Sequence, residues 1–250
     1  MTGQKRAKSF PTVGAVILAG GFGTRIKHLY PTVPKPMIEV CGRPFLEWVI
    51  RHLASQGVVV FSLSVGYRCE VVEEYLRNRP ADGLNIAAVR EDAPQGTAGG
   101  FLMAARSLPA CEAFLIANGD SLVLADLLPV LRSFGEGRAD AVIWGRWMED
   151  CSRYGSLECD SSGFLTGFRE KRPGKGLINA GIYLVSKKLL GDFPSTVPLS
   201  FEHDVFPLLL AKKRRIAVAE THAPFIDIGT PETVGEAESF IRDHFSPQWG

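Results

Sequence analysis

Three glycines and an arginine follow directly after an apolar run near the start of the numbered chain. The run is Val13–Leu18, and it continues as Ala19-Gly-Gly-Phe-Gly-Thr-Arg25. Glycines let the backbone approach a ligand closely and point several N–H groups at it, which suits a phosphate. Ten residues later, Lys35 lies between Pro34 and Pro36, and a proline on each side stiffens its backbone. A stiff cation near a phosphate loop indicates a site that positions negative charge.

Two well-known phosphate loops do not fit this segment. A P-loop ends in Lys-Ser or Lys-Thr, and neither follows the glycines here. The dinucleotide fingerprint needs a third small residue where Ile26 stands, and this large β-branched side chain would hold a helix away from the strand. The sequence therefore argues against a nicotinamide oxidoreductase. A tight turn without a ligand is the structural alternative for the glycines, but it does not account for Arg25 and Lys35.

Two aspartates stand in apolar surroundings and suggest a metal site. Asp120 follows the apolar run Ala113–Ala117, and Asp227 lies within Phe225-Ile-Asp-Ile. An aspartate is costly to bury unless it is paired or binds a metal. Two carboxylates together with phosphate oxygens and water suit Mg²⁺. The alternatives are an Asp turn at Asp120 and a salt bridge at Asp227.

These segments together resemble the signature of the sugar-1-phosphate nucleotidyltransferases, which make nucleotide-sugars from a nucleoside triphosphate and a sugar 1-phosphate and release pyrophosphate. The likeness begins with Leu18–Arg25 and Pro34-Lys-Pro36. It spans about residues 13–245 and continues, in the family's order, through Pro94-Gln-Gly-Thr-Ala-Gly-Gly100, Asn118-Gly-Asp120, Glu170-Lys171, Asn179-Ala-Gly181 and Phe225-Ile-Asp-Ile-Gly-Thr-Pro231.

Within this family the chain is most similar to the D-glycero-α-D-manno-heptose-1-phosphate and mannose-1-phosphate guanylyltransferases. Arg153–Ser156, Gly176–Tyr183 and Leu199–Asp204 carry that likeness. It implies GTP and D-glycero-α-D-manno-heptose 1-phosphate as the favoured substrates, with mannose or glucose 1-phosphate and another triphosphate as the alternative. Two positions depart from the family pattern. Ile26 replaces the usual Leu, and Gln95 stands near the base pocket where many members have Leu.

The resemblance also implies roles for individual residues. Arg25 would brace the departing β- and γ-phosphates, and Lys35 would lie between the α-phosphate and the incoming sugar phosphate. Asp120 and Asp227 would share one Mg²⁺. The residues expected to bind the nucleotide are Leu18, Ala19, Gly20, Gly21, Gly23, Thr24, Arg25, Gln95, Gly96, Thr97, Asn118 and Gly119. Those expected to bind the sugar phosphate are Lys35, Tyr154, Gly155, Glu170, Lys171, Asn179 and Gly181.

The reaction needs no general base, because the attacking sugar-phosphate oxygen is already anionic. Catalysis is then alignment of two polyanions and neutralisation of their charge. A non-catalytic homologue that senses nucleotide-sugars is an alternative of a different class. Intact Arg25, Lys35, Asp120 and Asp227 argue against it.

Apolar runs alternate with helical patterns and must position these side chains. Parallel sheets bind ligands beyond the carboxyl ends of their strands, where the segments 20–25 and 118–120 fall. The pattern predicts an α/β fold with a mixed but mostly parallel sheet flanked by helices. The resemblance implies that this fold is Rossmann-like and of the nucleotide-diphospho-sugar transferase type. Strands are predicted at Val13–Leu18, Val58–Val65, Leu84–Val89, Ala113–Ala117, Ala139–Gly145 and Leu177–Val185, with a hairpin across 156–168. Helices are predicted from Pro44, over Arg68–Arg79 and Thr97–Leu108, from Ser200 to about Lys212 with a kink at Pro207, and from Pro231.

Composition fits one globular domain. The 250 residues are 46% hydrophobic and 22% charged, with a net charge of +1 that gives no general attraction for nucleic acid. We expect a flexible tail at 1–12 and one domain at 13–250, in which 13–138 mainly binds nucleotide and 139–250 mainly binds sugar phosphate. No apolar stretch is long enough to span a membrane. Five cysteines without a C-x-x-C pair indicate free thiols in a cytoplasmic protein. Dimers are common in the family, so the resemblance also allows a homodimer.

Overall fold

The computed structural model describes residues 12–169 and 173–245. The predicted tail therefore lies outside the described residues, except for Thr12. Glu170 and Lys171, both expected to bind the sugar phosphate, also lie outside them.

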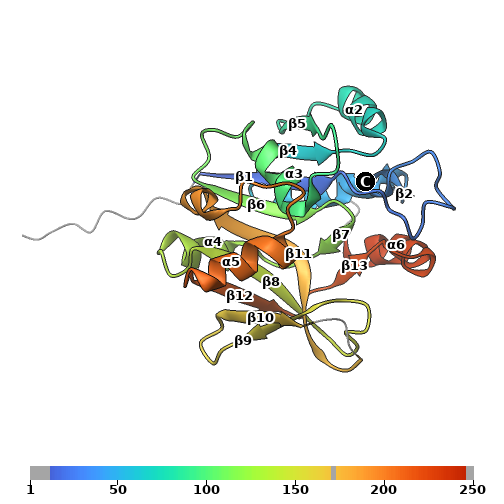
Figure 1. Ribbon diagram of the computed structural model, residues 1–250. Helices are drawn as coiled ribbons and strands as arrows, with labels where there is room; N and C mark the ends of the chain where they lie inside the picture. The colour runs from blue at the N-terminus through green and yellow to red at the C-terminus, as the bar shows by residue number, and fades with distance from the viewer. Residues whose placement is uncertain (1–11, 170–172, 246–250) are drawn as a thin grey trace, which may run out of the picture.

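A nine-stranded sheet forms the middle layer of the described part of the chain (Figure 1). Four strands form its parallel part in the order β6-β1-β4-β5. Each of these strands coincides with an apolar run of the sequence. They are β1 (Val13–Ala19), β4 (Val60–Val65), β5 (Asn85–Arg90) and β6 (Ala113–Asn118). All four were predicted within one or two residues of their observed bounds.

The other part of the sheet is mostly antiparallel and continues from β6. The long strand β11 (Gly176–Ser186) pairs with β6, with β8 (Ala141–Met148) and with β9 (Ser156–Cys159), and all three pairings are antiparallel. Strand β10 (Leu165–Arg169) completes the predicted hairpin with β9. Strand β12 (Ile216–Thr221), which was not predicted, lies parallel to β8. The fold class predicted from the sequence is confirmed.

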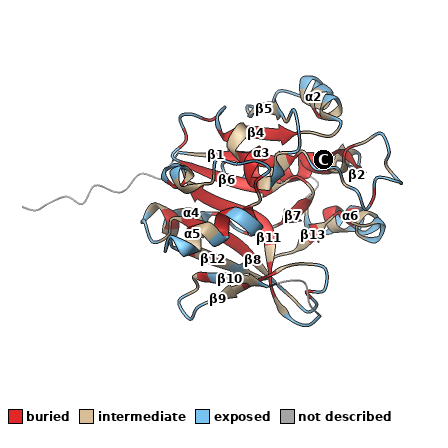
Figure 2. Cartoon of the chain, in the orientation of Figure 1, coloured by how far each residue is buried: buried red, intermediate tan, exposed pale blue. Residues whose placement is uncertain are grey.

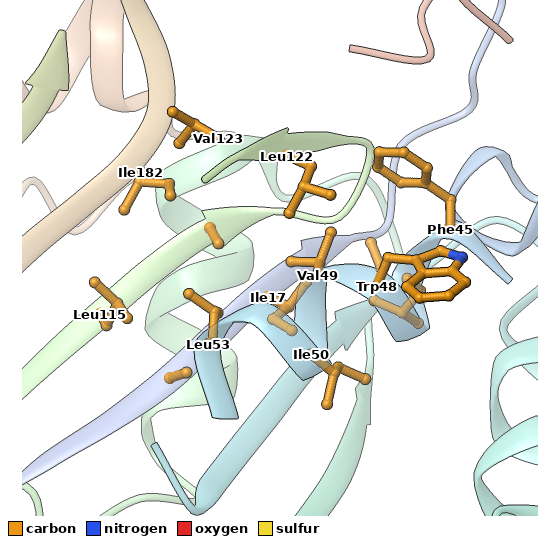
Figure 3. Packing of buried hydrophobic residues seen from close by; sticks show 14 of the residues in the cluster. Ile17, Phe45, Trp48, Val49, Ile50, Leu53, Leu115, Leu122, Val123 and Ile182 are labelled. Carbon is orange, nitrogen blue, oxygen red and sulfur yellow. The ribbon is translucent and has the colours of Figure 1, made fainter. Parts of the chain in front are cut away.

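Helices cover both faces of the sheet, because neighbouring residues of a strand point to opposite faces. Ile17 of β1 packs in one apolar cluster with helix α1 (Phe45–Ser55), whereas Val16 packs in a second cluster with α3 (Gly96–Ala105). Figure 3 shows Ile17 and Leu115 facing the apolar side chains of α1. Residues of the sheet are largely buried, and the outer faces of the helices are exposed (Figure 2).

The remaining helices divide between the same two clusters. Helices α2 (Cys69–Asn78), α4 (Leu128–Gly135) and α6 (Pro231–His244) contribute to the cluster of α1, and α5 (Phe206–Ala211) to that of α3. The short elements are η1 (Lys35–Met37), β2 (Glu39–Val40), β3 (Arg43–Pro44), β7 (Ser121–Val123), η2 (Lys187–Asp192), η3 (Phe201–Val205) and β13 (Phe225–Asp227).

The helix predicted from Ser200 to about Lys212 is irregular near Pro207. The Ser200 hydroxyl caps the helix as expected and accepts hydrogen bonds from the backbone N–H groups of Glu202 and His203. The first turn, η3, is a π-helix, and the α-helix begins only at Phe206. Pro207 is the second residue of α5 and lies just after the change from π-helix to α-helix.

The predicted state of the thiols is confirmed. All five cysteines lie within the described ranges, and none forms a disulfide. Among the described helices, none combines the length and the apolar character that crossing a membrane demands.

His52 is a buried titratable group on the core-facing side of α1. The residue is 7% exposed, and its Nε2 atom has no hydrogen-bond partner. Burial lowers the pKa of His52 from 6.5 to about 4, against the opposing effect of a hydrogen bond with the Ala125 backbone. The folded protein therefore keeps this imidazole neutral through mildly acidic pH.

We expect His52 to make the protein less stable as the pH falls from about 6.5 towards 4. In that range His52 is protonated in the unfolded chain but stays neutral in the folded protein. The free energy of unfolding therefore drops by up to ~1.4 kcal/mol per pH unit. His52→Leu should flatten this slope. Urea unfolding of both proteins at pH 7.5, 6, 5 and 4.5 measures it, and equal slopes would contradict the assignment.

Candidate active site

The site lies at the carboxyl ends of β1 and β6, which are neighbours in the sheet. The chain leaves β1 towards α1 on one face and reaches β6 from α3 on the other, so the strand order reverses between them. Ligands of open α/β sheets bind at such a point. The loop after β1 does not start a helix. Ile26 turns into the core at 2% exposure, and α1 begins only at Phe45, as expected for a loop that is not a dinucleotide fingerprint.

A cavity of about 420 Å³ opens beside this loop and collects nearly all residues predicted to bind the nucleotide. Gly119 is the exception, because its N–H donates to the Leu18 carbonyl at 2.9 Å and ties the end of β6 to that of β1. The predicted residues that line the cavity are Leu18, Ala19, Gly20, Gly21, Gly23, Thr24, Arg25, Gln95, Gly96, Thr97 and Asn118. Lys35 and Asp120 line it too.

Glu91 also lines this cavity, and the sequence analysis missed it. Its carboxylate accepts hydrogen bonds from the Ser64 hydroxyl (2.6 Å) and the Gln95 backbone N–H (3.2 Å). A Cβ atom at Gly20 would collide with this carboxylate, so a larger residue there would displace it. Glu91 directly follows β5. Because ligands bind beyond the carboxyl ends of parallel strands, the end of β5 was the available signal for this residue.

Lys35 lies between the two predicted metal ligands. Its Nζ is 2.6 Å from Asp120 Oδ2 and 3.8 Å from Asp227 Oδ1, and its side chain is only 9% exposed. Helix η1 starts at Lys35 between two prolines, and Gly23, with φ of +57°, packs against the Lys35 Cβ position. The lysine is thus fixed from both sides, as its proline neighbours predicted.

Strand pairing brings the two aspartates together across more than 100 residues of sequence. Strands β7 and β13 form a two-stranded antiparallel sheet in which Asp227 is opposite Ser121, the neighbour of Asp120. The Ile228 N–H donates to the Asp120 carbonyl at 3.0 Å and extends this pairing. Figure 1 shows β7 and β13 beside α6, away from the outer strands β9 and β10.

Gly229 lies where four charged side chains converge, and the sequence analysis did not assign it a role. Its N–H donates to Asp227 Oδ1 at 2.6 Å. A Cβ atom at this position would collide with that oxygen and lie 3.2 Å from both Arg25 Nη2 and Lys35 Nζ. Asp227, Arg25 and Lys35 therefore surround one point, with Asp120 bonded to the lysine. A glycine between an aspartate and a helix cap was the available signal.

A second cavity, of about 740 Å³, lies on the other side of this centre. It takes in Tyr154, Gly155, Asn179 and Gly181, four of the residues predicted to bind the sugar phosphate. Lys35 lines the nucleotide cavity instead. Asn118 lines both cavities, and Asp227 lines the second. At Gly181 the β11 register shifts and φ is +75°, which lets the backbone pass close against the Asn118 amide.

Tyr154 links the second cavity to the carboxylates. Its ring packs edge-on against Phe225 of β13, with ring centroids 5.9 Å apart. Burial, and after it the charge of Asp227, raises the pKa of the Tyr154 phenol. The hydroxyl therefore stays protonated and can donate a hydrogen bond to a phosphate or a sugar oxygen.

Arg153, Glu202 and His203 are among the side chains that line the second cavity but were not predicted to bind the sugar. Arg153 is exposed, and its guanidinium lies 5.5 Å from the centroid of the Tyr154 ring. Glu202 and His203 come from η3. All three stand in segments that resemble the guanylyltransferases, so that likeness was the signal for them.

Comparisons with known proteins agree with this geometry. The family model described as nucleotidyl transferase matches residues 14–244. Two relatives named D-glycero-alpha-D-manno-heptose 1-phosphate guanylyltransferase are similar to the chain. That of Campylobacter jejuni is 35% identical over 87% of this chain and 95% of its own length, and that of Aneurinibacillus thermoaerophilus is 32% identical over 92% and 99%. HddC from Yersinia pseudotuberculosis complexed with GMP-PN superposes with a TM-score of 0.79 at 33% identity, covering 91% of this chain and 98% of that one.

Gly229→Ala tests the convergence of charged groups at this point. The new methyl group would push Asp227 away from Lys35 and Arg25, so we expect turnover to fall by about 100-fold, as for other small displacements of reacting groups. Gly235→Ala, in α6 of the same segment, is the matched control because its Cβ would meet nothing within 4 Å. The control should keep full activity and gain about 0.5–1 kcal/mol of stability. Equal activities of the two variants would contradict the geometry.

Proposed function

Because the chain belongs to the nucleotidyl transferase family, we propose that it transfers a guanylyl group from GTP to D-glycero-α-D-manno-heptose 1-phosphate and releases pyrophosphate. The family and the enzyme class predicted from the motifs are confirmed by the family match and by relatives named as sugar-1-phosphate guanylyltransferases. The choice of base and sugar is the proposal.

One observation carries the reaction type. The nucleotide cavity and the second cavity meet at Asn118 and at the Asp120–Lys35–Asp227 group. Two substrates held in these cavities would bring their phosphates to the same point. This arrangement of two cavities around paired cations and carboxylates supports a reaction that joins the phosphate groups of two substrates.

The proposed step is an in-line displacement at the α-phosphorus. The anionic oxygen of the sugar phosphate forms the new P–O bond, and the bond from the α-phosphorus to the oxygen bridging it to the β-phosphate breaks. The electron pair leaves with pyrophosphate, so no proton needs to move. Arg25 is exposed and unpaired among the described residues, and it faces the cavity of the triphosphate. Its planar fork suits the departing phosphates, and Lys35 suits the α-phosphate.

The two aspartates suit the predicted Mg²⁺. Both already face one cation, the Lys35 ammonium, and their oxygens are the hard donors that Mg²⁺ takes. Within residues 12–169 and 173–245, no group of three or more His, Cys, Asp or Glu side chains is arranged to hold a metal. Asp120 and Asp227 would hold the ion with phosphate oxygens and water, and the ion would add positive charge where the phosphates meet.

Two side chains of the nucleotide cavity support guanine as the base. A carboxylate only accepts hydrogen bonds, and guanine offers it two adjacent donors at N1 and N2. Glu91 is such a carboxylate, and adenine would turn a ring acceptor towards it. The Gln95 side chain lines the same cavity, and its amide donates to the Ala93 carbonyl at 2.8 Å, which fixes the orientation of the amide. The sugar assignment rests on the relatives named for heptose 1-phosphate.

A substrate matrix tests the proposal by measuring pyrophosphate release. GTP, ATP, CTP and UTP are each paired with heptose, mannose and glucose 1-phosphates. We expect kcat/KM for GTP to exceed the others by at least about 100-fold, because a wrong base leaves buried polar groups unpaired. The kcat/KM for heptose 1-phosphate should exceed that for mannose 1-phosphate by only about tenfold, since the two sugars differ by one hydroxymethyl unit.

Each other outcome of the matrix has a definite meaning. A preference for CTP or UTP would overturn the guanylyl assignment, and a preference for glucose 1-phosphate would overturn the heptose assignment. No turnover with any pair, together with tight binding of a nucleotide-sugar, would favour the non-catalytic sensing homologue.

Asp227→Asn tests the metal assignment. The amide keeps the oxygen that accepts from the Gly229 N–H but loses the charge that would hold Mg²⁺. We expect kcat to fall by about 100-fold or more, since metal charge contributes several kcal/mol at such sites. Mn²⁺ binding, followed by electron paramagnetic resonance with a non-reacting GTP analogue, should weaken in parallel. The control is Asp126→Asn, an exposed aspartate before α4 that lines neither cavity. Normal Mn²⁺ binding by Asp227→Asn would contradict the assignment.

A further inference from the structure

Glu202 is a half-buried carboxylate in the second cavity that no ion pair explains. It lies in η3, and no cationic side chain of the described ranges comes within ion-pair distance of it. A carboxylate that is partly removed from water needs hydrogen-bond donors in place of a counter-charge.

Neighbouring side chains supply three donors and fix the orientation of the carboxylate. Glu202 Oε1 accepts from the Tyr183 hydroxyl at 2.8 Å and from the Asn179 amide at 3.3 Å, and Oε2 accepts from the Ser200 hydroxyl at 3.0 Å. Burial, and after it the charge of Glu202, raises the pKa of Tyr183 well above its usual range, so its hydroxyl remains a donor. Two carboxylate oxygens offer about four lone-pair positions. One position on Oε2 is therefore left for a donor from the cavity.

The Asn179 amide is committed to neighbouring groups through both of its donors. Its Nδ2 donates to the Tyr183 hydroxyl at 2.9 Å and to Glu202, and its Oδ1 accepts from the Gly181 N–H at 3.0 Å. Asn179, which was expected to bind the sugar phosphate, lines the cavity and also helps to hold Glu202 in place.

The charge of Glu202 decides which end of a substrate it faces. A carboxylate repels phosphate, whereas it accepts strongly from a hydroxyl group. Lys35 and Arg25 lie around Asp227 and Gly229, and Asp227 lines the same cavity as Glu202. A sugar 1-phosphate in this cavity would turn its phosphate towards Asp227 and Lys35 and its ring hydroxyls towards Glu202.

The backbone of this segment is bonded to the nucleotide-binding turn. The Leu199 N–H donates to the Gln95 carbonyl at 2.7 Å, and the Phe201 N–H donates to the Thr97 hydroxyl at 3.0 Å. The Ala98 N–H returns a bond to the Leu199 carbonyl at 2.8 Å. One turn thus sets the position of both the base cavity and Glu202.

We propose that Glu202 accepts a hydrogen bond from one ring hydroxyl of the sugar 1-phosphate and thereby determines which sugars react, an inference that rests on the proposed function. Tyr183, Asn179 and Ser200 hold its carboxylate in the receiving orientation.

The test combines Glu202→Gln with monodeoxy sugar phosphates. Glu202→Gln keeps the size of the side chain and an acceptor oxygen but loses its charge. With GTP saturating, we expect KM for the best sugar 1-phosphate to rise about 10- to 100-fold while KM for GTP changes less than about twofold. The 2-, 3-, 4- and 6-deoxy analogues of mannose 1-phosphate are then compared in both proteins. The analogue that lacks the hydroxyl bound by Glu202 should lose activity in the parent protein and lose nothing further in the variant.

Asp204→Asn is the matched control. It makes the same acid-to-amide change two residues away in η3, at a carboxylate that accepts from the Ser200 N–H at 2.7 Å and does not line the cavity. Its sugar KM should equal that of the parent. Thermal unfolding of both variants checks that the fold is kept.

Two failures are distinguishable. If the parent protein turns over no sugar 1-phosphate, the proposed function fails. If the parent is active and Glu202→Gln shows an unchanged KM, or an equal added loss with all four deoxy analogues, the role of Glu202 is overturned while the function stands.

Discussion

The contact of Lys35 with two carboxylates governs the arrangement of the site. Asp120 and Asp227 are like charges on a short two-stranded sheet, and a third residue must balance them at close range. Lys35 does so from a side chain that is almost fully removed from water, where electrostatic attraction is less screened. The same centre must accept two polyanions, so cations and carboxylates have to alternate around it. Gly229 has no side chain and therefore leaves room for Asp227, Arg25 and Lys35 to approach one another.

The sheet explains why the centre lies between two cavities. Strands β1 and β6 deliver the glycine loop and Asp120 at one strand-order reversal, and β11 pairs with the other edge of β6. The nucleotide cavity therefore forms on the parallel side of β6 and the second cavity on its antiparallel side. Asn118 at the end of β6 faces both. The mixed sheet thus gives each proposed substrate its own half and one shared border.

Close backbone contacts connect the two halves. The turn that opens α3 is hydrogen-bonded to the strand-like segment before η3, and Gly96 takes a φ of +74° where a side chain would collide with the Leu199 backbone. The cavities proposed to bind the base and the sugar therefore share one hydrogen-bonded support. A support of this kind lowers the entropy cost of aligning two substrates for reaction.

Local patterns in the sequence determined most of the longer elements, the family and most of the nucleotide cavity. Apolar runs, capping residues and glycines act over a few neighbouring positions, so β1, α1 and the loop to Arg25 follow from them directly. The tertiary structure alone decided which distant side chains meet. Asp227 joins Asp120 through the pairing of β13 with β7, and Glu202 meets Tyr183 and Asn179 through the packing of η3 on β11. Tyr183 and Glu202 are 19 residues apart in the sequence, and the two aspartates are more than 100 residues apart. Contacts between such distant residues require the chain to close a loop, and no local propensity encodes them.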